Sequence, residues 1–350
     1  MSMLNSLTTV VVEAPPSSCC DTAWVWSTCN VLQQAINNAS DYTTIELKPG
    51  TYCNNGYYIQ SKSDPSEYQN GTLASIQDKK HLTIKGLWEN GERPVLKFDG
   101  WYGIKITTSE NIIIHNIEVQ GVNLRIDGAE ATANRDRMTG LDDGGCGGYD
   151  GSVTEDECNA VDNCSWSSTL GYCYGDLFSY YSGIGIAVED SDNVHIRLCE
   201  VHHCPGSGIR ADRSDNISIY NNLVYGNTWW TTAAPSALTF AESSGTGENN
   251  LVGNVVYGNR NFMPYFKTYI PTGGAEVNSV YGAWNQDYII DGPGVSLTRN
   301  QDYEGTFNLN NNIAYDNGIN GLVLHKATNS NATLNAKNNL IFANGTTTKD

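Results

Sequence analysis

The chain repeats itself at intervals of 23 to 30 residues, and no other feature of the sequence restricts its fold as strongly. The segment that begins at Gly185 aligns with the segment that begins at Gly208, and Gly294 aligns in the same way with Gly321. Each unit contains short runs of alternating apolar and polar residues, separated by turns rich in Asn and Gly. Units of this size cannot bury their apolar residues alone. We therefore expect them to stack into a parallel β-solenoid.

Residues 29–52 indicate how the solenoid begins. Apolar residues from Val31 to Ala39 recur at helical spacing, and a strand and a Pro-Gly turn follow. A single amphipathic helix would cover the first coil, whose apolar interior and strand edges are otherwise exposed. This helix, the strand and the Pro-Gly-Thr-Tyr turn, together with the coils, resemble the right-handed parallel β-helix superfamily that includes pectate lyases and related polysaccharide-active proteins. The resemblance implies an all-β, right-handed parallel β-helix with an N-terminal capping helix.

The alignment of the coils also divides the chain into segments. We expect an N-terminal extension, the capping helix with the first coils, a Cys-rich acidic insertion and the remaining coils at residues 1–28, 29–122, 123–182 and 183–350. Further coils or a C-terminal cap are expected beyond Asn344. The insertion, a disulfide-rich loop, has eight acidic residues and no Lys or Arg between Asp142 and Asp176. Its acids are either solvated or bind Ca²⁺ through the carboxylates at 142–151. No other cofactor is predicted.

Cysteines and glycosylation sequons indicate an extracellular, secreted protein. The ten cysteines, all expected in disulfides, are Cys19, Cys20, Cys29, Cys53, Cys146, Cys158, Cys164, Cys173, Cys199 and Cys204. The six predicted glycosylation sites are Asn38, Asn70, Asn163, Asn216, Asn331 and Asn344. A local disulfide between Cys199 and Cys204 is favoured over a metal site, because His202 and His203 should face opposite sides of a strand. A cytosolic protein with unpaired thiols is the alternative.

The charge balance excludes some partners. The chain has 20 Lys and Arg against 38 Asp and Glu, a net charge of -18. Such a balance repels nucleic acid and anionic membrane surfaces. No apolar run approaches the roughly 20 residues that span a bilayer.

Aligning the coils by their leading glycine places side chains in columns, because coils stack about 4.8 Å apart. Alternation along a strand predicts inward side chains at Ile186, Val188, Ile209, Ala211, Leu238, Phe240, Val295, Leu297, Leu322 and Leu324. The second residue after the glycine faces outward at Lys105, Ala187, Arg210, Thr239, Ser296 and Val323, and the fourth at Thr107, Glu189, Asp212, Ala241, Thr298 and His325. The fifth residues form a charged ridge of Asp190, Arg213, Glu242, Arg299 and Lys326.

Cationic and aromatic residues beside this ridge suit an anionic polysaccharide. In β-elimination a cation neutralises the uronate carboxylate while a base removes the neighbouring proton. The predicted catalytic residues are Lys326, Arg299, His325, Glu242 and Arg213. The predicted substrate-binding residues are Trp229, Trp230, Tyr265, Lys267, Arg210 and Asp212. The alternative for the two Trp residues is a loop lid packed on the flank of the solenoid.

Two alternatives stay open. Hydrolysis would need two carboxylates beside the scissile bond, for which Glu242 and Asp212 are candidates. The chain lacks the RxPxxR of pectate lyases and the YGxDPHD of alginate epimerases. The second alternative is therefore a non-catalytic structural or adhesive extracellular glycoprotein, a cell-wall, matrix or filament subunit capable of self-assembly.

Overall fold

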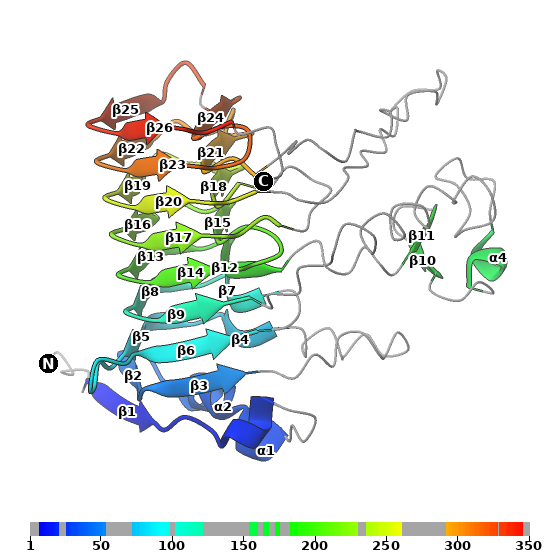
Figure 1. The fold of residues 1–350 in the computed structure, drawn as a ribbon, viewed down its shortest axis with the longest axis vertical. Helices are drawn as coiled ribbons and strands as arrows, with labels where there is room; N and C mark the ends of the chain where they lie inside the picture. The colour runs from blue at the N-terminus through cyan, green and yellow to red at the C-terminus, as the bar shows by residue number, and fades with distance from the viewer. Residues whose placement is uncertain are drawn as a thin grey trace, which may run out of the picture.

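The computed structural model describes residues 7–20, 26–53, 72–98, 102–121, 154–159, 164–167, 172–175, 183–229, 236–260, 292–327 and 329–345. Within them, three parallel sheets wind into a right-handed β-helix (Figure 1). We name the sheets A, B and C, and each full coil takes one strand from sheet C, then one from A, then one from B. No helix in the described part of the chain is long and apolar enough to span a membrane.

The strands of each sheet follow the chain order. Sheet A contains β1 (Thr8–Val12), β2 (Thr43–Leu47), β5 (Lys80–Gly86), β8 (Glu110–His115), β13 (Asp192–Arg197), β16 (Ser218–Tyr220), β19 (Glu248–Val252), β22 (Thr306–Asn310) and β25 (Thr333–Lys337). Sheet B contains β3 (Gly50–Cys53), β6 (Pro94–Lys97), β9 (Glu118–Gln120), β14 (Glu200–His202), β17 (Leu223–Tyr225), β20 (Val255–Tyr257), β23 (Ile313–Tyr315) and β26 (Leu340–Phe342). Sheet C contains β4 (Thr72–Gln77), β7 (Tyr102–Thr107), β12 (Ile184–Glu189), β15 (Ile209–Asp212), β18 (Leu238–Ala241), β21 (Val295–Thr298) and β24 (Leu322–His325).

The strand register confirms the offsets of the sequence repeat. Ile186 pairs with Ile209 at the predicted offset of 23 residues, and Val295 pairs with Leu322 at the predicted 27. The predicted inward residues from Ile186 to Leu297 are buried in one continuous core. Leu322 is half-buried and Leu324 exposed, since β24 is the edge strand of sheet C and no further described strand covers it.

Glycine recurs where the chain turns from sheet B into sheet C. A Cβ atom at Gly185 would lie 2.4 Å from Val201 Cγ1, and one at Gly208 would lie 2.6 Å from Val224 Cγ1. The interior valines therefore fill the space that any other side chain would need. This close packing explains why the leading glycine marks each unit of the repeat.

Two buried ladders of Asn side chains fix the corners that flank sheet B. In each ladder Asn Oδ1 accepts hydrogen bonds from the backbone N–H and the Nδ2 of the Asn one coil earlier. The inner Asn ladders are Asn222, Asn254, Asn312 and Asn339 between sheets A and B, and Asn227, Asn259, Asn317 and Asn344 between sheets B and C. They satisfy backbone groups that the tight turns would otherwise leave buried without partners.

Cys199 and Cys204 do not form the predicted disulfide; both are buried free thiols. Cys199 stands at the head of the first inner Asn ladder, where its N–H donates to Asn222 Oδ1, and Cys204 donates in the same way to Asn227. The two residues therefore lie at different corners of the solenoid. Burial raises the pKa of the Cys199 thiol to about 11 and also raises that of Cys204.

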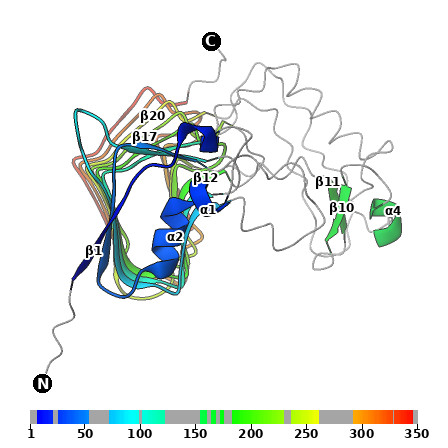
Figure 2. The ribbon, with the colours of Figure 1, turned by 90° about the horizontal axis from the view of Figure 1, so that it is seen from below.

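The N-terminal helix caps the solenoid as predicted. Leu32 and Ile36 of α2 (Val31–Asn38) are buried, and the helix lies across the end of the coil stack (Figure 2). Gln33 bonds the backbone of Ser75 on β4 through both of its amide atoms, at 2.6 and 2.9 Å. A helix side chain thus satisfies one N–H and one carbonyl group on the open edge of sheet C. The sequence did not predict β1, which pairs parallel with β2 and extends sheet A.

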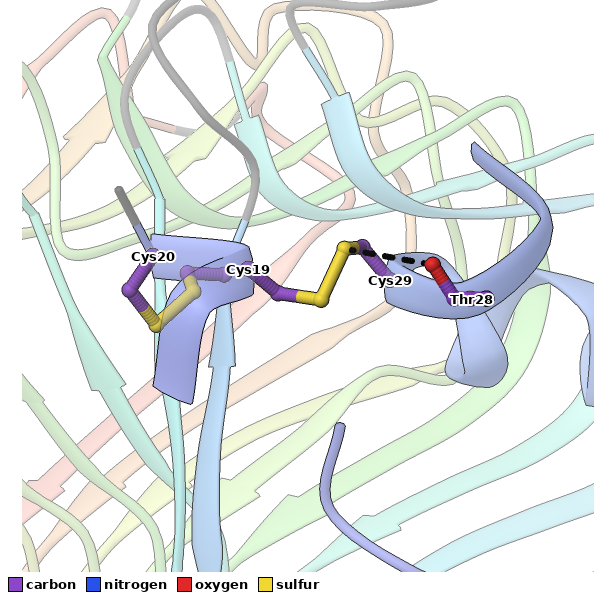
Figure 3. The surroundings of a disulfide bond; sticks show 5 residues. Cys19, Cys20, Thr28 and Cys29 are labelled. Carbon is purple, nitrogen blue, oxygen red and sulfur yellow. Dashed lines mark hydrogen bonds between the residues drawn. A yellow bond between two sulfur atoms is a disulfide. The ribbon is translucent and has the colours of Figure 1, made fainter. Parts of the chain in front are cut away.

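Four of the ten cysteines expected in disulfides form two bridges, whose pairing the sequence did not predict, and both bridges fasten the capped end. Cys19 joins Cys29, and Cys20 joins Cys53 (Figure 3). They connect η1 (Ser17–Cys20) to α1 (Trp26–Cys29) and to β3. In the insertion, β10 (Cys164–Ser167) and β11 (Tyr172–Gly175) form an antiparallel pair beside α4 (Glu155–Asn159). Cys146 lies outside the described residues, as do the side chains of Cys158, Cys164 and Cys173.

The three corners of the solenoid differ in length. The A-to-B and C-to-A connections between described strands are short turns. The longest connections, residues 54–71, 121–183 and 258–294, each run from a strand of sheet B to the next strand of sheet C. The border of sheet C is therefore where coils differ most from one another.

Candidate functional site

Five polar side chains from three consecutive strands converge on the outer face of sheet C. Tyr102 and Lys105 come from β7, Glu189 from β12, and Arg210 and Asp212 from β15. The parallel register pairs Glu189 with Asp212 directly. We call this group the sheet C cluster.

The cluster is held together by ion pairs and a ring contact. Lys105 Nζ lies 3.2 Å from Glu189 Oε2 and 4.6 Å from the centre of the Tyr102 ring. Arg210 Nε donates to Asp212 Oδ2 at 2.6 Å. Each carboxylate therefore has a cation, and both cations have side-chain N–H donors left for a further anion.

Asp212 is the most unusual member of the cluster. It is only 9% exposed, and its Oδ1 is buried with no hydrogen-bond partner among the described residues. Burial raises the pKa of Asp212 above its ordinary value, although Arg210 opposes the shift. A carboxylate with one unsatisfied oxygen and a raised pKa is a stronger base than an exposed aspartate.

Tyr102 is a neutral hydrogen-bond donor in this setting. Burial, together with the charge of Glu189, raises the pKa of Tyr102 to about 12. The phenol thus keeps its proton at neutral pH. The cluster brings together a base, two cations and a proton donor, the groups that proton abstraction beside a carboxylate requires.

The predicted charged ridge exists, but its charges pair with one another. Arg213 donates two hydrogen bonds to Asp190, at 2.8 and 3.0 Å, and Arg299 NH1 lies 2.9 Å from Glu242 Oε1. Arg213 also lies 3.7 Å from Glu242. The four residues therefore form one continuous row of ion pairs, which we call the corner ladder: Asp190, Arg213, Glu242 and Arg299. The bond to Arg213 lowers the pKa of Asp190. Each member has a positive φ of 48 to 56°, because the chain bends there from sheet C into sheet A.

His325 and Lys326 lie one coil beyond the corner ladder. His325 Nδ1 lies 3.2 Å from Thr298 Oγ1 on the neighbouring strand. Lys326 is exposed and has no ion-pair partner in the part of the chain that the structure describes. These two residues are therefore adjacent to Arg299, as the column alignment predicted, but outside the ion-pair chain.

The structure contradicts the predicted aromatic platform at Trp229. Its side chain is only 6% exposed, and Nε1 donates to the His203 carbonyl at 2.9 Å. The polar loop sequence indicated an exposed side chain, but the indole can be buried because one hydrogen bond satisfies its N–H. Trp230, Tyr265 and Lys267 lie outside the described residues.

The outward columns are also less exposed than the alignment predicted. Ala187, Thr239 and Ser296 are buried although they face outward. Ala187 is a small residue between Lys105 and Arg210, whose longer side chains flank it on both neighbouring strands. Among the described residues, no group of three or more His, Cys, Asp or Glu is arranged to hold a metal ion. The carboxylates at 142–151, proposed for Ca²⁺, lie outside those residues.

Sequence reasoning placed Lys105 and Glu189 in the outward columns but did not assign them to the site, and it missed Tyr102. Lys105 and Glu189 meet across the insertion, where the repeat gives no offset. Tyr102 directly precedes the leading glycine Gly103. Its bulky phenol at that position was the one sequence feature that could have indicated a role in the site.

Comparisons with known proteins concern mainly the fold. The family model described as a right handed beta helix region matches residues 96–279, and no curated protein matches the chain. An alginate lyase from Paenibacillus sp. str. FPU-7 is 11% identical, with a TM-score of 0.43 over 91% of this chain and 75% of that one. The A-module of the Azotobacter vinelandii mannuronan C-5 epimerase AlgE4 is 15% identical, with a TM-score of 0.42 over 90% and 67%. Pectate lyase Pel9A is 13% identical, with a TM-score of 0.42 over 91% and 68%.

Proposed function

The chain belongs to the right-handed beta-helix family, and from this premise we propose that it binds an anionic polysaccharide on sheet C and cleaves it by β-elimination. The observation that carries the proposal is the unsatisfied, buried Oδ1 of Asp212 beside Arg210. Lys105 and Tyr102 complete the set of groups that the reaction uses.

The proposed reaction assigns one role to each member of the sheet C cluster. Arg210 and Lys105 neutralise the uronate carboxylate, which makes the neighbouring C5 proton more acidic. Asp212 removes that proton, a double bond forms between C4 and C5, and the C4–O bond breaks. The Tyr102 hydroxyl gives its proton to the leaving oxygen and regains one from solvent. Glu189 positions Lys105 and Tyr102.

We assign the corner ladder to binding along the polymer, with less direct roles than the sequence predicted. Arg213 and Arg299 are already paired with acids, so a uronate must compete for them. Lys326, exposed and without an acid partner in the described residues, is the better contact for a second carboxylate. His325 lies beside it.

A panel of uronate polymers tests the proposal. With polygalacturonate, alginate or a glycosaminoglycan, the ultraviolet absorbance of the unsaturated product should grow, and Asp212→Asn and Arg210→Gln should each slow that growth at least about 100-fold. Asp302→Asn, an exposed carboxylate outside the cluster, is the control that retains activity. A flat trace with every polymer would reject elimination.

One observation favours the non-catalytic alternative. The corner ladder satisfies its own charges, as expected of a surface that stabilises the stack and binds nothing. On that reading the protein is a structural or adhesive subunit. Ordered polymers of the purified protein in electron micrographs, together with the flat trace, would support it.

We also propose that the protein is secreted and glycosylated. The two disulfides suit an oxidising compartment. Asn38 and Asn331 are exposed and suit glycan attachment, and the bond that Asn331 Nδ2 donates to Glu304 is itself exposed to solvent, whereas Asn344 Nδ2 donates to two carbonyls within an inner Asn ladder. Asn216 Nδ2 donates to Asp192, and Asn70 and Asn163 lie outside the described residues. A mobility shift after endoglycosidase treatment that Asn38→Gln and Asn331→Gln remove would support these two sites.

A further inference from the structure

Two neighbouring histidines at the end of β14 face each other. His202 Nδ1 lies 2.5 Å from His203 Nδ1, and the two rings are nearly perpendicular. The expectation that they point to opposite sides of a strand is wrong, because His203 has a φ of 55° and leaves the strand. The left-handed turn brings its ring back toward His202.

Glu118 sets the tautomer of His202. This residue lies on β9, the neighbouring strand of sheet B, and its Oε1 is 3.1 Å from His202 Nε2. The bond also lowers the pKa of Glu118. A carboxylate on Nε2 holds the proton there, which leaves the Nδ1 lone pair directed at His203.

The surrounding residues hold both rings in place. The buried His202 ring stacks on Tyr225 with a centroid distance of 4.9 Å, and Tyr225 donates to Glu200 at 2.7 Å. Tyr225 stacks in turn on Tyr257. His203 meets the edge of the same Tyr225 ring. The two nitrogens are thus preorganised with little side-chain freedom left to lose.

We propose that His202 and His203 chelate a divalent transition metal ion, Cu²⁺ or Zn²⁺, through their Nδ1 atoms. Imidazole nitrogen suits both ions, and Cu²⁺ should bind more tightly. With bonds of about 2.0–2.1 Å, two neighbouring nitrogens lie about 2.9 Å apart around a square-planar Cu²⁺ and about 3.3 Å apart around a tetrahedral Zn²⁺, so the pair must open by about 0.4 to 0.8 Å. Since no third His, Cys, Asp or Glu joins them among the described residues, water fills the remaining positions.

The site has the outer-shell arrangement of a metal centre. A carboxylate bonded to the far nitrogen of a ligating histidine orients the ring and makes it a better ligand. Glu118 occupies that position. The proposal is independent of the sheet C cluster, because none of its residues belongs to that cluster.

Isothermal titration of the intact protein with Cu²⁺ and with Zn²⁺ tests the proposal. We expect one ion per chain, and electron paramagnetic resonance of the Cu²⁺ form should show two coupled imidazole nitrogens. His203→Ala should abolish this binding, and Glu118→Gln should weaken it about 10- to 100-fold. His325→Ala, an exposed histidine on sheet C, is the matched control and should bind as the unaltered protein does.

Two results would overturn the proposal. If neither ion binds, or if His203→Ala binds as tightly as the unaltered protein, the pair only shares a proton. Glu118→Gln keeps the shape of the half-buried carboxylate and guards against loss of folding as the explanation. Circular dichroism of each variant should remain unchanged.

Discussion

Asp212 is a residue at which burial and charge oppose each other. Its raised pKa means that the folded protein holds the proton more tightly than the unfolded chain does. Its contribution to the free energy of unfolding is therefore present at low pH and is lost as pH rises through the raised pKa. Asp212→Asn should lower the rate of elimination about 10²–10⁴-fold without lowering the melting temperature at neutral pH. A fall in both would identify Asp212 as a structural residue.

The same shift predicts the acid limb of the activity. Asp212 must be ionised to act as a base, and its raised pKa keeps the proton on at pH values where an exposed aspartate has lost it. kcat/KM should therefore begin to fall on the acid side at a higher pH than an ordinary carboxylate would give. A pH–rate profile of the unaltered protein measures this limb. A rate that stays flat through that range would exclude Asp212 as the base.

Asn259 shows how much one ladder residue contributes. It is fully buried; its Nδ2 donates to Asn317 at 2.8 Å, and its Oδ1 accepts from the Asn227 N–H at 2.9 Å. Asn259→Ala leaves the buried Asn227 N–H without its partner, at about 1–3 kcal/mol, whereas Asn317 Oδ1 keeps the bond from the Asn259 backbone N–H. Chemical denaturation should show this loss, and Asn320→Ala, at an exposed position, should show almost none.

Predictions for single residues succeeded where the alternation along one strand determines burial. They failed where contacts with residues distant in sequence determine it. The inward residues of sheet C follow from alternation alone, and the core confirms them. Trp229 was assigned to the surface because its polar neighbours gave no sign of the carbonyl that satisfies its N–H. Cys199 and Cys204 are close in sequence, but strand β14 separates them because they lie at the two corners that flank sheet B, and sequence spacing does not reveal those corners.

At the level of elements, α2 supplies hydrogen bonds to the edge of sheet C that a neighbouring strand would otherwise make. Gln33→Ala removes both bonds to Ser75 and should cost about 1 kcal/mol for each. The Ser75 amide should then exchange hydrogen faster, whereas Asn38→Ala, at the exposed end of the helix, should not alter it. Unchanged exchange at Ser75 would mean that apolar packing alone holds the cap.

The order of elements was predictable from the repeat, but the contacts across the insertion were not. Offsets of 23 and 27 residues give the register of later coils directly. Lys105 and Glu189 lie 84 positions apart, and only the three-dimensional stack brings them together. The core of the site therefore depends on a long-range pairing that no local pattern encodes.

At the scale of the whole molecule, each strand pair of the three parallel sheets joins neighbouring coils within the described residues. The Cys20–Cys53 disulfide closes a separation of 33 residues and should contribute about 3–4 kcal/mol by the chain-entropy model. Removing it in a Cys20→Ser, Cys53→Ser variant should speed hydrogen exchange in β2 and β3. Because a solenoid transmits stability mainly to adjacent repeats, β22 and β23 should keep their protection. Equal loss at both ends would show that the solenoid unfolds as one unit.

The unequal corners have an evolutionary consequence. Two edges of the solenoid have connections of only two to seven residues between described strands, whereas the edge between sheets B and C accepts connections from a few residues to about sixty. Insertions can therefore accumulate along that edge without any change in the core, each entering at a separate coil. Homologues should keep short turns at the other two edges and diverge in length at this one. Selection can therefore change the loops beside the outer face of sheet C separately at each coil.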